Sequence, residues 1–315
     1  MAHIVTVVIA TWNGAERIIS TLTALAEQRC SPDLFEVIIV DNNSSDATTR
    51  VGDDHPGVNL IRKQGVKCKV VSEPTLGLTY ARIRGVLEAE AELICFLDDD
   101  NVPETDYIQV GASAFTDPTI GILVSRVFPK YEQQPPLSIE RREPMLAITQ
   151  SFGESVIDLG ASATFVPTFG AGMWLSRKAF LEAVPWQTPE KLMIGRKGKC
   201  LISGDDMEIG YLIGRAGYRR LYWPELRLFH LISRKRVTAS YFSRLITGIA
   251  RSNMCLNARY GFKKYGIAHR CLSLIILVIN IMMTPLILLQ RDGVREARFN
   301  LAKKWAHFMG PYNII

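Results

Sequence analysis

Apolar runs alternate with amphipathic patterns over the first ninety residues. The β-branched runs "IVTVVIA" (4–10) and "FEVIIVD" (35–41) predict buried strands, and "KCKVVSE" (67–73) predicts a shorter one. The stretches "AERIISTLTALAEQ" (15–28) and "LTYARIRGVLEAEA" (78–91) have helical patterns. Strands that alternate with helices indicate βαβ units, and we therefore expect an α/β protein with a mostly parallel, Rossmann-like sheet.

A further apolar run, in "ELICFLDDDNVPE" (92–104), ends in the three acids Asp98, Asp99 and Asp100. Ligands of such sheets bind at the carboxyl ends of the strands. Thr11 and Asp41 stand at the ends of the first two predicted strands, and Asp98 stands at the end of this further apolar run. We therefore expect the functional site at this edge of the sheet.

The second half of the chain reads less regularly. A helix is predicted over 136–152, and a strand or loop that leads into a helix over 168–180. The stretch "ISGDDMEIGYLIGRAGY" (202–218) opens a helix with acids at its N-terminus, where the helix dipole favours them. The stretch "RRLYWPELRLFHLI" (219–232) predicts a turn and a strand that ends near His230.

The three consecutive acids predict a divalent cation. Carboxylates at a strand end suit Mg²⁺ or Mn²⁺, which bind through one or two carboxylates together with substrate phosphates. The alternative is a solvated acidic surface loop. The buried run before the acids, and the matching strand ends at Thr11 and Asp41, favour the metal site.

Five motifs resemble those of one known family. They are "VVIATWNG", "VDNNSSDAT", "GLTYARIRG", "FLDDDNVPE" and "SGDDMEIGYLIGRAGY". Their order and spacing are similar to those of family 2 glycosyltransferases with the GT-A fold, such as bacterial exopolysaccharide transferases. The resemblance covers roughly residues 4–232 and implies a nucleotide-diphospho-sugar transferase domain, followed here by a C-terminal helical region.

The resemblance also implies roles for single residues. Thr11, Asn13 and Asp41 would line the nucleotide pocket, with Asp41 on the base, while Arg82 would lie near the donor. Asp98 would contact the ribose side of the bound nucleotide-sugar donor. The metal would be held by Asp100, with Asp98 and His230 beside it.

The acid pair in "SGDD" implies the general base. Asp206 is preferred, and Asp205 is the alternative, because the family often has Glu-Asp where this chain has two aspartates. The family often has Asn after the Arg of "YAR", where this chain has Ile83. The QxxRW motif of processive synthases is absent, which favours transfer of one sugar per binding event. The resemblance further implies an inverting enzyme of hexosyltransferase type.

Elementary chemistry supports two separate acid groups. The leaving diphosphate must be neutralised, which a metal can do as a Lewis acid. A base on the opposite face of the sugar must take the proton of the acceptor hydroxyl. The acids at 98–100 and at 205–206 supply these two functions.

Two alternatives from other classes remain open. "DDDNV" also matches the signature of haloacid-dehalogenase phosphatases, in which Asp98 would be a nucleophile that forms an aspartyl-phosphate. That signature normally follows the first strand of a domain, whereas about ninety residues precede it here. An inactive GT-A binding module is the second alternative. A nicotinamide enzyme is disfavoured, because no GxGxxG follows the first strand.

The charge is divided unevenly along the chain, whose net charge is +6. Residues 231–315 hold 14 Lys or Arg and two acids, a net charge of +12, which leaves −6 on the first 230 residues. We therefore expect a catalytic domain over 1–232 and a basic, helical region over 233–315.

The basic region contains "CLSLIILVINIMMTPLILL" (271–289), a run without charge that is borderline for a membrane span. Basic residues flank it on both sides: Lys263, Lys264, Arg270, Arg291, Arg295 and Arg298. This pattern predicts an anionic membrane surface as a partner, rather than nucleic acid. The alternative is a buried core helix or an oligomer interface through the C-terminal helices.

The cysteines and the N-terminus indicate the compartment. Six scattered cysteines with no CxxC pair suit a reducing environment, and "MAHIVTVVIATWNG" lacks the features of a signal peptide. We expect a cytoplasmic enzyme associated, peripherally or integrally, with the inner face of the plasma membrane. Its substrates would be a UDP- or GDP-type nucleotide-sugar donor and a glycan or lipid-linked acceptor.

Overall fold

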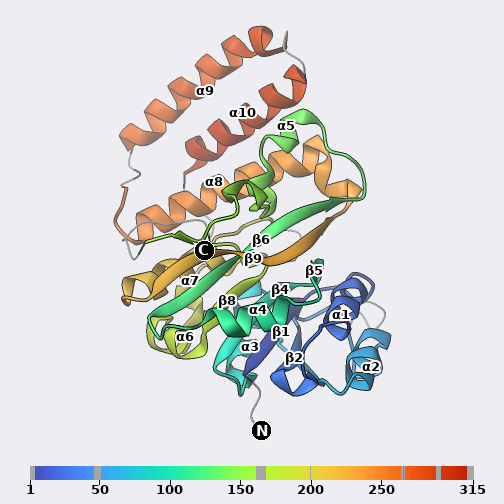
Figure 1. Ribbon diagram of the computed structural model, residues 1–315. Coiled ribbons are helices and arrows are strands. Elements are labelled where there is room, and N and C mark those ends of the chain that lie inside the picture. The colour runs from blue at the N-terminus through green and yellow to red at the C-terminus, as the bar shows by residue number, and fades with distance from the viewer. Residues whose placement is uncertain are drawn as a thin grey trace. The chain divides into compact units, whose positions relative to one another are not determined.

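A computed structural model of the chain describes residues 4–45, 51–160, 168–198, 200–263, 265, 267–288 and 292–310 (Figure 1). The chain divides into two compact units. The first comprises 1–130, 147–198 and 205–231, and the second comprises 131–146, 199–204 and 232–315. Each unit is described by itself.

The first unit begins with the predicted parallel strands. They are β1 (Val5–Thr11), β2 (Phe35–Asp41), β3 (Lys67–Ser72) and β4 (Leu93–Asp98), and they lie in the order β3-β2-β1-β4. β1 pairs in parallel with both β2 and β4, and β2 with β3. β2 is buried along its whole length, which explains why its sequence reads as a continuous apolar run rather than an alternating one.

Helices connect these strands as the patterns predict. α1 (Ile18–Ala26) follows β1 and α3 (Leu78–Glu88) precedes β4. Two short helices add to them, α2 (Pro56–Lys63) and α4 (Tyr107–Ala114). α2 begins with Pro56 directly after His55, whose ring accepts a hydrogen bond from the Gly57 amide, so the helix start is capped.

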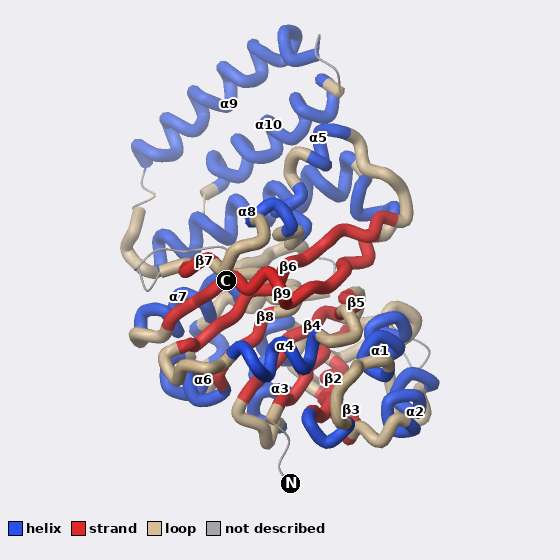
Figure 2. Tube along the Cα trace, in the orientation of Figure 1, coloured by secondary structure: helices blue, strands red, loops and turns tan. Residues whose placement is uncertain are grey.

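The sheet continues beyond β4 in the order β8-β6-β9-β5 and becomes mixed (Figure 2). These strands are β5 (Asn101–Pro103), β6 (Ile120–Tyr131), β8 (Met173–Ser176) and β9 (Arg219–Ile232), and the two-residue β7 (Ile157–Asp158) pairs with β9. β8 runs antiparallel to β4, and β5 antiparallel to β9. α6 (Arg177–Ala183) follows β8, and α7 (Asp205–Arg215) precedes β9.

The helix predicted over 136–152 is wrong. The structure has only α5 (Leu137–Glu140) and short 3₁₀ turns at Glu143–Leu146 and Gln150–Phe152. Pro144 lacks the amide that a continuous helix would need and disfavours helical backbone at the residue before it. Ala147 has φ 59°, in the left-handed region, which also breaks the pattern.

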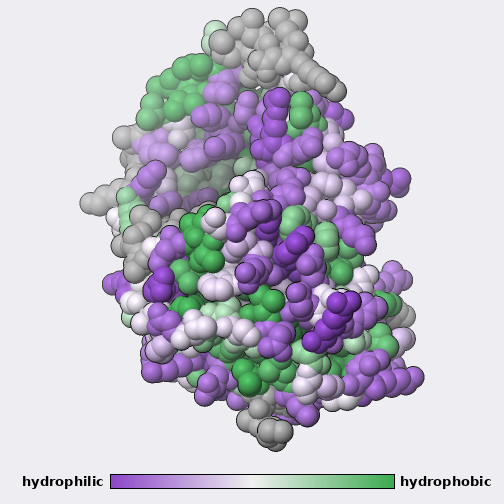
Figure 3. All heavy atoms as spheres, viewed as in Figure 1, coloured by the Kyte–Doolittle hydropathy of each residue, from purple (hydrophilic) through white to green (hydrophobic). Residues whose placement is uncertain are grey.

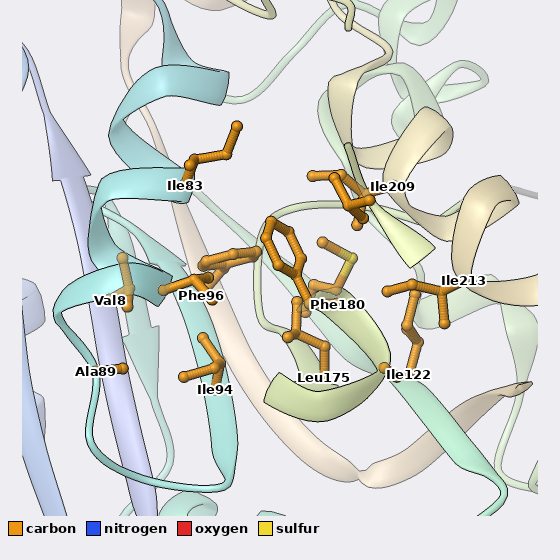
Figure 4. Close-up of a cluster of buried hydrophobic side chains, with 14 of the residues drawn as sticks. Val8, Ile83, Ala89, Ile94, Phe96, Ile122, Leu175, Phe180, Ile209 and Ile213 are labelled. Carbon is orange, nitrogen blue, oxygen red and sulfur yellow. The ribbon is translucent and has the colours of Figure 1, made fainter. Parts of the chain in front are cut away.

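A buried apolar cluster supports the strands from which the acids project (Figure 4). In that view the Phe180 ring of α6 lies beside Phe96 of β4, and Ile213 of α7 lies beside Ile122 of β6. All four side chains are at most 1% exposed. Burial of apolar surface stabilises the fold by about 25 cal/mol per Å², and here it holds β4 and α7 in one core.

The second unit contains three longer helices, α8 (Ala239–Arg259), α9 (Ile267–Leu288) and α10 (Gly293–Met309). α10 packs against both α8 and α9, and the tilted rings of Phe242 and Phe299 are in contact, with centroids 5.1 Å apart. The C-terminal helical region expected from the sequence is therefore confirmed. Among the residues described, no helix is both long and apolar enough to cross a bilayer. Residue 289 of the predicted apolar run, and the flanking Lys264 and Arg291, lie outside the described residues.

Candidate active site

The carboxyl ends of three parallel strands meet at one edge of the sheet. Thr11 at the end of β1 is the register partner of Asp41 at the end of β2, and Ala10 is the partner of Asp98 at the end of β4. The structure thus places Thr11, Asp41 and Asp98 on neighbouring strand ends, where the sequence analysis expects the site. Their roles stay predictions.

The loops after β1 and β2 are joined by side-chain hydrogen bonds. The Ser44 hydroxyl accepts a bond of 2.9 Å from the Asn13 amide, and the Asn13 side-chain oxygen accepts one of 2.8 Å from the Ser45 amide. Ser44 also donates its hydroxyl to buried Asp41. Asn13 has φ 50°, a left-handed conformation that asparagine tolerates. Asn13 and Asp41 are therefore linked through Ser44.

Asn42, which the sequence analysis left without a role, fixes a third loop. Its side-chain amide donates to the Thr75 carbonyl at 2.7 Å, and its oxygen accepts from the Gly77 amide at 2.8 Å. Gly77 has φ 151°, which favours glycine, and it precedes α3. Asn42 directly follows the strand-end residue Asp41, and this position was the signal in the sequence that could have identified it as a site residue.

The acidic turn that joins β4 to β5 sends its three carboxylates to different partners. The Asp98 side chain is 36% exposed and lies 3.5 Å from Arg82. Asp99 turns inward and is buried. Asp100 lies beside His230 of β9.

Asp99 forms an ion pair that the sequence reasoning missed. Its carboxylate accepts bonds from the Thr11 hydroxyl at 2.7 Å and from Arg17 at 2.7 and 3.2 Å. Arg17 also donates to the carbonyls of Trp12 and Asn13, so it ties the loop after β1 to the acidic turn. Burial raises the pKa of Asp99 to about 6, against the opposing effect of Arg17.

Asp100 and His230 are brought together by strand pairing. Asn101 is the register partner of His230, and the Leu231 amide donates to the Asp100 carbonyl at 2.9 Å. The Nε2 atom of His230 lies 3.4 Å from a carboxylate oxygen of Asp100, and the His230 side chain is 3% exposed. Over the described residues, no cluster of three or more metal-ligating side chains is formed. Two of the three predicted ligands thus converge, while Asp98 faces Arg82.

Arg82 of α3 joins the two acid groups of the site. One nitrogen donates to Asp205 at 2.6 Å, and another lies 3.5 Å from Asp98. The guanidinium also lies over the Phe96 ring, 5.4 Å from its centroid. Gly170 makes room for it, because a Cβ there would lie 1.8 Å from an Arg82 nitrogen. The end of β4 and the start of α7 are therefore connected through one buried cation.

Asp206 is held differently from its neighbour. One of its carboxylate oxygens accepts from the Gly170 amide at 2.9 Å, and the other from the Met207 amide at 2.8 Å. Burial, followed by the neighbouring charge of Asp205, raises the pKa of Asp206 to about 6, while Arg82 works in the opposite direction. This carboxylate can therefore exchange a proton close to neutral pH.

Comparison with known proteins establishes the family. The model of glycosyl transferase family 2 matches residues 6–184, which is more than half of the chain, and the chain belongs to that family. Among curated proteins, it is 40% identical over 108 residues to the amylovoran biosynthesis glycosyltransferase AmsB of Erwinia amylovora, a match that covers 34% of each protein. It is also 30% identical over 105 residues to the putative glycosyltransferase EpsH of Bacillus subtilis, which covers 33% of this chain and 28% of that protein. These matches span about a third of the relatives' length or less.

Solved structures share the fold. The mannosyltransferase PcManGT of Pyrobaculum calidifontis, in complex with GDP-Man and Mn²⁺, superimposes with a TM-score of 0.56 at 17% identity, over 98% of this chain and 72% of that one. S. aureus TarS 1-349 in complex with UDP-GlcNAc gives 0.52 at 16% identity, over 98% and 90%. The predicted GT-A-type α/β fold with a C-terminal helical region is confirmed, and the family match does not favour the phosphatase alternative.

Proposed function

We propose that the protein is an inverting glycosyltransferase, of hexosyltransferase type, that moves one sugar from a nucleotide-sugar donor to a glycan or lipid-linked glycan. The observation that carries the proposal is the bridge made by Arg82 between Asp98 and Asp205. It holds a strand-end acid group of the kind that binds donors next to a second acid group of the kind that activates acceptors. The family membership supports the same reaction.

The nucleotide would bind at the joined loops after β1 and β2. Asp41 would accept from the base, with Thr11 and Asn13 beside it and Asp98 toward the ribose. A donor of UDP or GDP type is supported by the two similar structures, which are complexes with UDP-GlcNAc and GDP-Man. The hydrogen bonds through Ser44 preorganise Asn13 and Asp41, which lowers the ordering cost of binding.

A divalent cation, Mg²⁺ or Mn²⁺, would be held by Asp100 and His230, with Asp98 as the third predicted ligand. The carboxylate and imidazole at 3.4 Å fit this class of cation, because Asp100 offers a hard oxygen and His230 a nitrogen that Mn²⁺ accepts. When bound, the cation supplies Lewis acidity toward the diphosphate. The similar structure that contains Mn²⁺ supports this choice.

Asp206, rather than Asp205, would be the general base. The Asp205 carboxylate is taken up by Arg82, whereas Asp206 is oriented by two backbone amides. Asp206 would take the proton of the acceptor hydroxyl as that oxygen bonds to the anomeric carbon. The bond from this carbon to the diphosphate oxygen breaks on the opposite face, so the anomeric configuration inverts.

The acceptor and location follow from the relatives and the charge pattern. A role in polysaccharide assembly is supported by the similarity to the amylovoran biosynthesis glycosyltransferase AmsB. The strongly basic residues 231–315 favour the inner, anionic face of the plasma membrane. There a cytosolic nucleotide sugar and a lipid-linked acceptor would meet.

A donor screen tests the function. A panel of UDP- and GDP-sugars is incubated with Mn²⁺, and release of nucleoside diphosphate is measured beside release of phosphate from a phosphomonoester. We expect release of nucleoside diphosphate from one donor class only, and a transferred product whose anomeric configuration, read by NMR, is inverted. Release of phosphate without turnover of any donor would instead support the phosphatase alternative.

A further inference from the structure

Helix α9 has an inverted distribution of polar and apolar side chains. Its described, exposed side chains are all apolar or Cys: Cys271, Leu272, Leu274, Ile275, Val278, Ile279, Ile281 and Met282. Its described polar side chains are buried or half-buried, and they include Ser273, Asn280 and Thr284. A helix at a protein surface normally shows the opposite arrangement.

The exposed apolar residues share one side of the helix. At about 100° per residue, they cover about half of its circumference, and the buried Ser273 and Leu277 lie opposite them. The inward polar groups are satisfied locally, since Asn280 donates to the Ile276 carbonyl at 2.8 Å and Thr284 to the Asn280 carbonyl at 2.9 Å. Figure 3 shows the resulting hydrophobic band over α9. Bands of this kind mark contact with lipid or with another protein.

The charge around this band decides between those partners. Residues 231–315 have 14 basic side chains and two acids, and both acids are used inside the unit: Asp292 pairs with Arg295, and Glu296 pairs with Arg142 at 2.7 Å. Arg298 and Lys303 of α10 are exposed, and so is Lys263 before α9. Two copies of so basic a region would repel each other, whereas an anionic surface would attract it.

Trp305 of α10 adds a second indication. Its side chain is 49% exposed and packs against Phe308, with ring centroids 5.5 Å apart and ring planes tilted by 42°. Exposed tryptophan beside basic residues is typical of the boundary between lipid headgroups and acyl chains.

We propose that the outward side of α9 is a membrane-docking surface that enters one leaflet of an anionic lipid bilayer, with the basic residues of α10 on the headgroups. α9 would lie in the plane of the interface, since its inward side packs along α10. The proposal rests on the proposed function only in explaining what docking is for, which is to bring the active site to a lipid-linked acceptor. Vesicle binding itself needs no donor.

The test is cosedimentation of the full chain with vesicles of phosphatidylcholine alone or mixed with phosphatidylglycerol. We expect binding to the mixed vesicles only, with partial release by high salt. The double variant Ile275→Ser, Ile279→Ser should lower the partition coefficient at least about tenfold, since each substitution removes an aliphatic group that the bilayer would bury. The matched control, Ile19→Ser with Leu87→Ser, replaces exposed apolar residues of the first unit and should bind like the wild type.

Three results would overturn the proposal. The wild type could bind neither vesicle, or the double variant could bind as well as the wild type. Sedimentation equilibrium could instead show a dimer that the double variant dissociates, with no vesicle binding, which would make a second copy the partner. Donor turnover in solution separates this inference from the proposed function. The double variant should keep the turnover rate of the wild type. A wild type that binds vesicles but turns over no donor would contradict the proposed function alone.

Discussion

Arg82 and Asp205 form a buried ion pair, with a hydrogen bond of 2.6 Å and side chains that are each 4% exposed. The two residues come from α3 and from the start of α7, 123 positions apart. Because the pair occupies the Asp205 carboxylate, two adjacent aspartates that are equivalent in sequence become different. Asp205 is a counter-ion, and Asp206 is the carboxylate left to exchange a proton.

Asp206→Asn should keep donor affinity and lose sugar transfer. A base acts on the acceptor hydroxyl and not on the nucleotide, so its removal should lower kcat by about a hundred- to ten-thousand-fold. Titration of nucleoside diphosphate and steady-state turnover measure the two quantities. A fall in nucleotide affinity as steep as the fall in turnover would place Asp206 in the donor site.

Asp205→Asn should destabilise the fold. Removing one partner of a buried pair leaves Arg82 without its closest counter-charge, which typically costs about 3–5 kcal/mol in the free energy of unfolding. The matched control is Arg219→Gln, which breaks ion pairs of a 44% exposed arginine and should cost about 1 kcal/mol or less. Urea unfolding measures both, and equal shifts of the two midpoints would contradict the role assigned to the buried pair.

Turnover with saturating donor should fall as the pH drops through about 6, the pKa of Asp206. Burial raises this pKa, so the ionised base is lost at a higher pH than an ordinary aspartate would allow. The raised pKa of Asp206 has the opposite effect on the free energy of unfolding. The contribution of protonated Asp206 to the folded state is complete below the unfolded pKa and is lost as the pH rises through about 6. A rate that stays flat from about pH 7 to about pH 5 would exclude Asp206 as the base.

Asp100→Ala should abolish the enhancement of nucleoside diphosphate binding by Mn²⁺ while the protein stays folded. The carboxylate beside His230 is the hard oxygen ligand of the proposed cation site. Calorimetric titration with and without Mn²⁺ measures the enhancement, and Glu27→Ala, which removes an exposed acid at the end of α1, is the control. If Asp100→Ala and Glu27→Ala show the same enhancement, the metal assignment is wrong.

Much of the first unit could be predicted from the sequence, because its information is local. β-branched runs fix the parallel strands, and in such a sheet the residue after each run must lie at the carboxyl edge. Thr11, Asp41 and Asp98 could therefore be placed together without any structure. The failure at 136–152 was also local, since Pro144 interrupts an otherwise helical pattern.

Only the tertiary structure decided what each acid contacts. Asp98, Asp99 and Asp100 are identical in type and adjacent in sequence, yet their partners are Arg82, Arg17 and His230, which come from α3, the loop after β1 and β9. Likewise, the sequence of α9 predicts an apolar helix, but only its packing against α10 shows which side is left exposed. Periodicity reports how a segment folds, whereas partners are set by contacts between segments distant in the chain, and these appear only when the strands and helices have assembled.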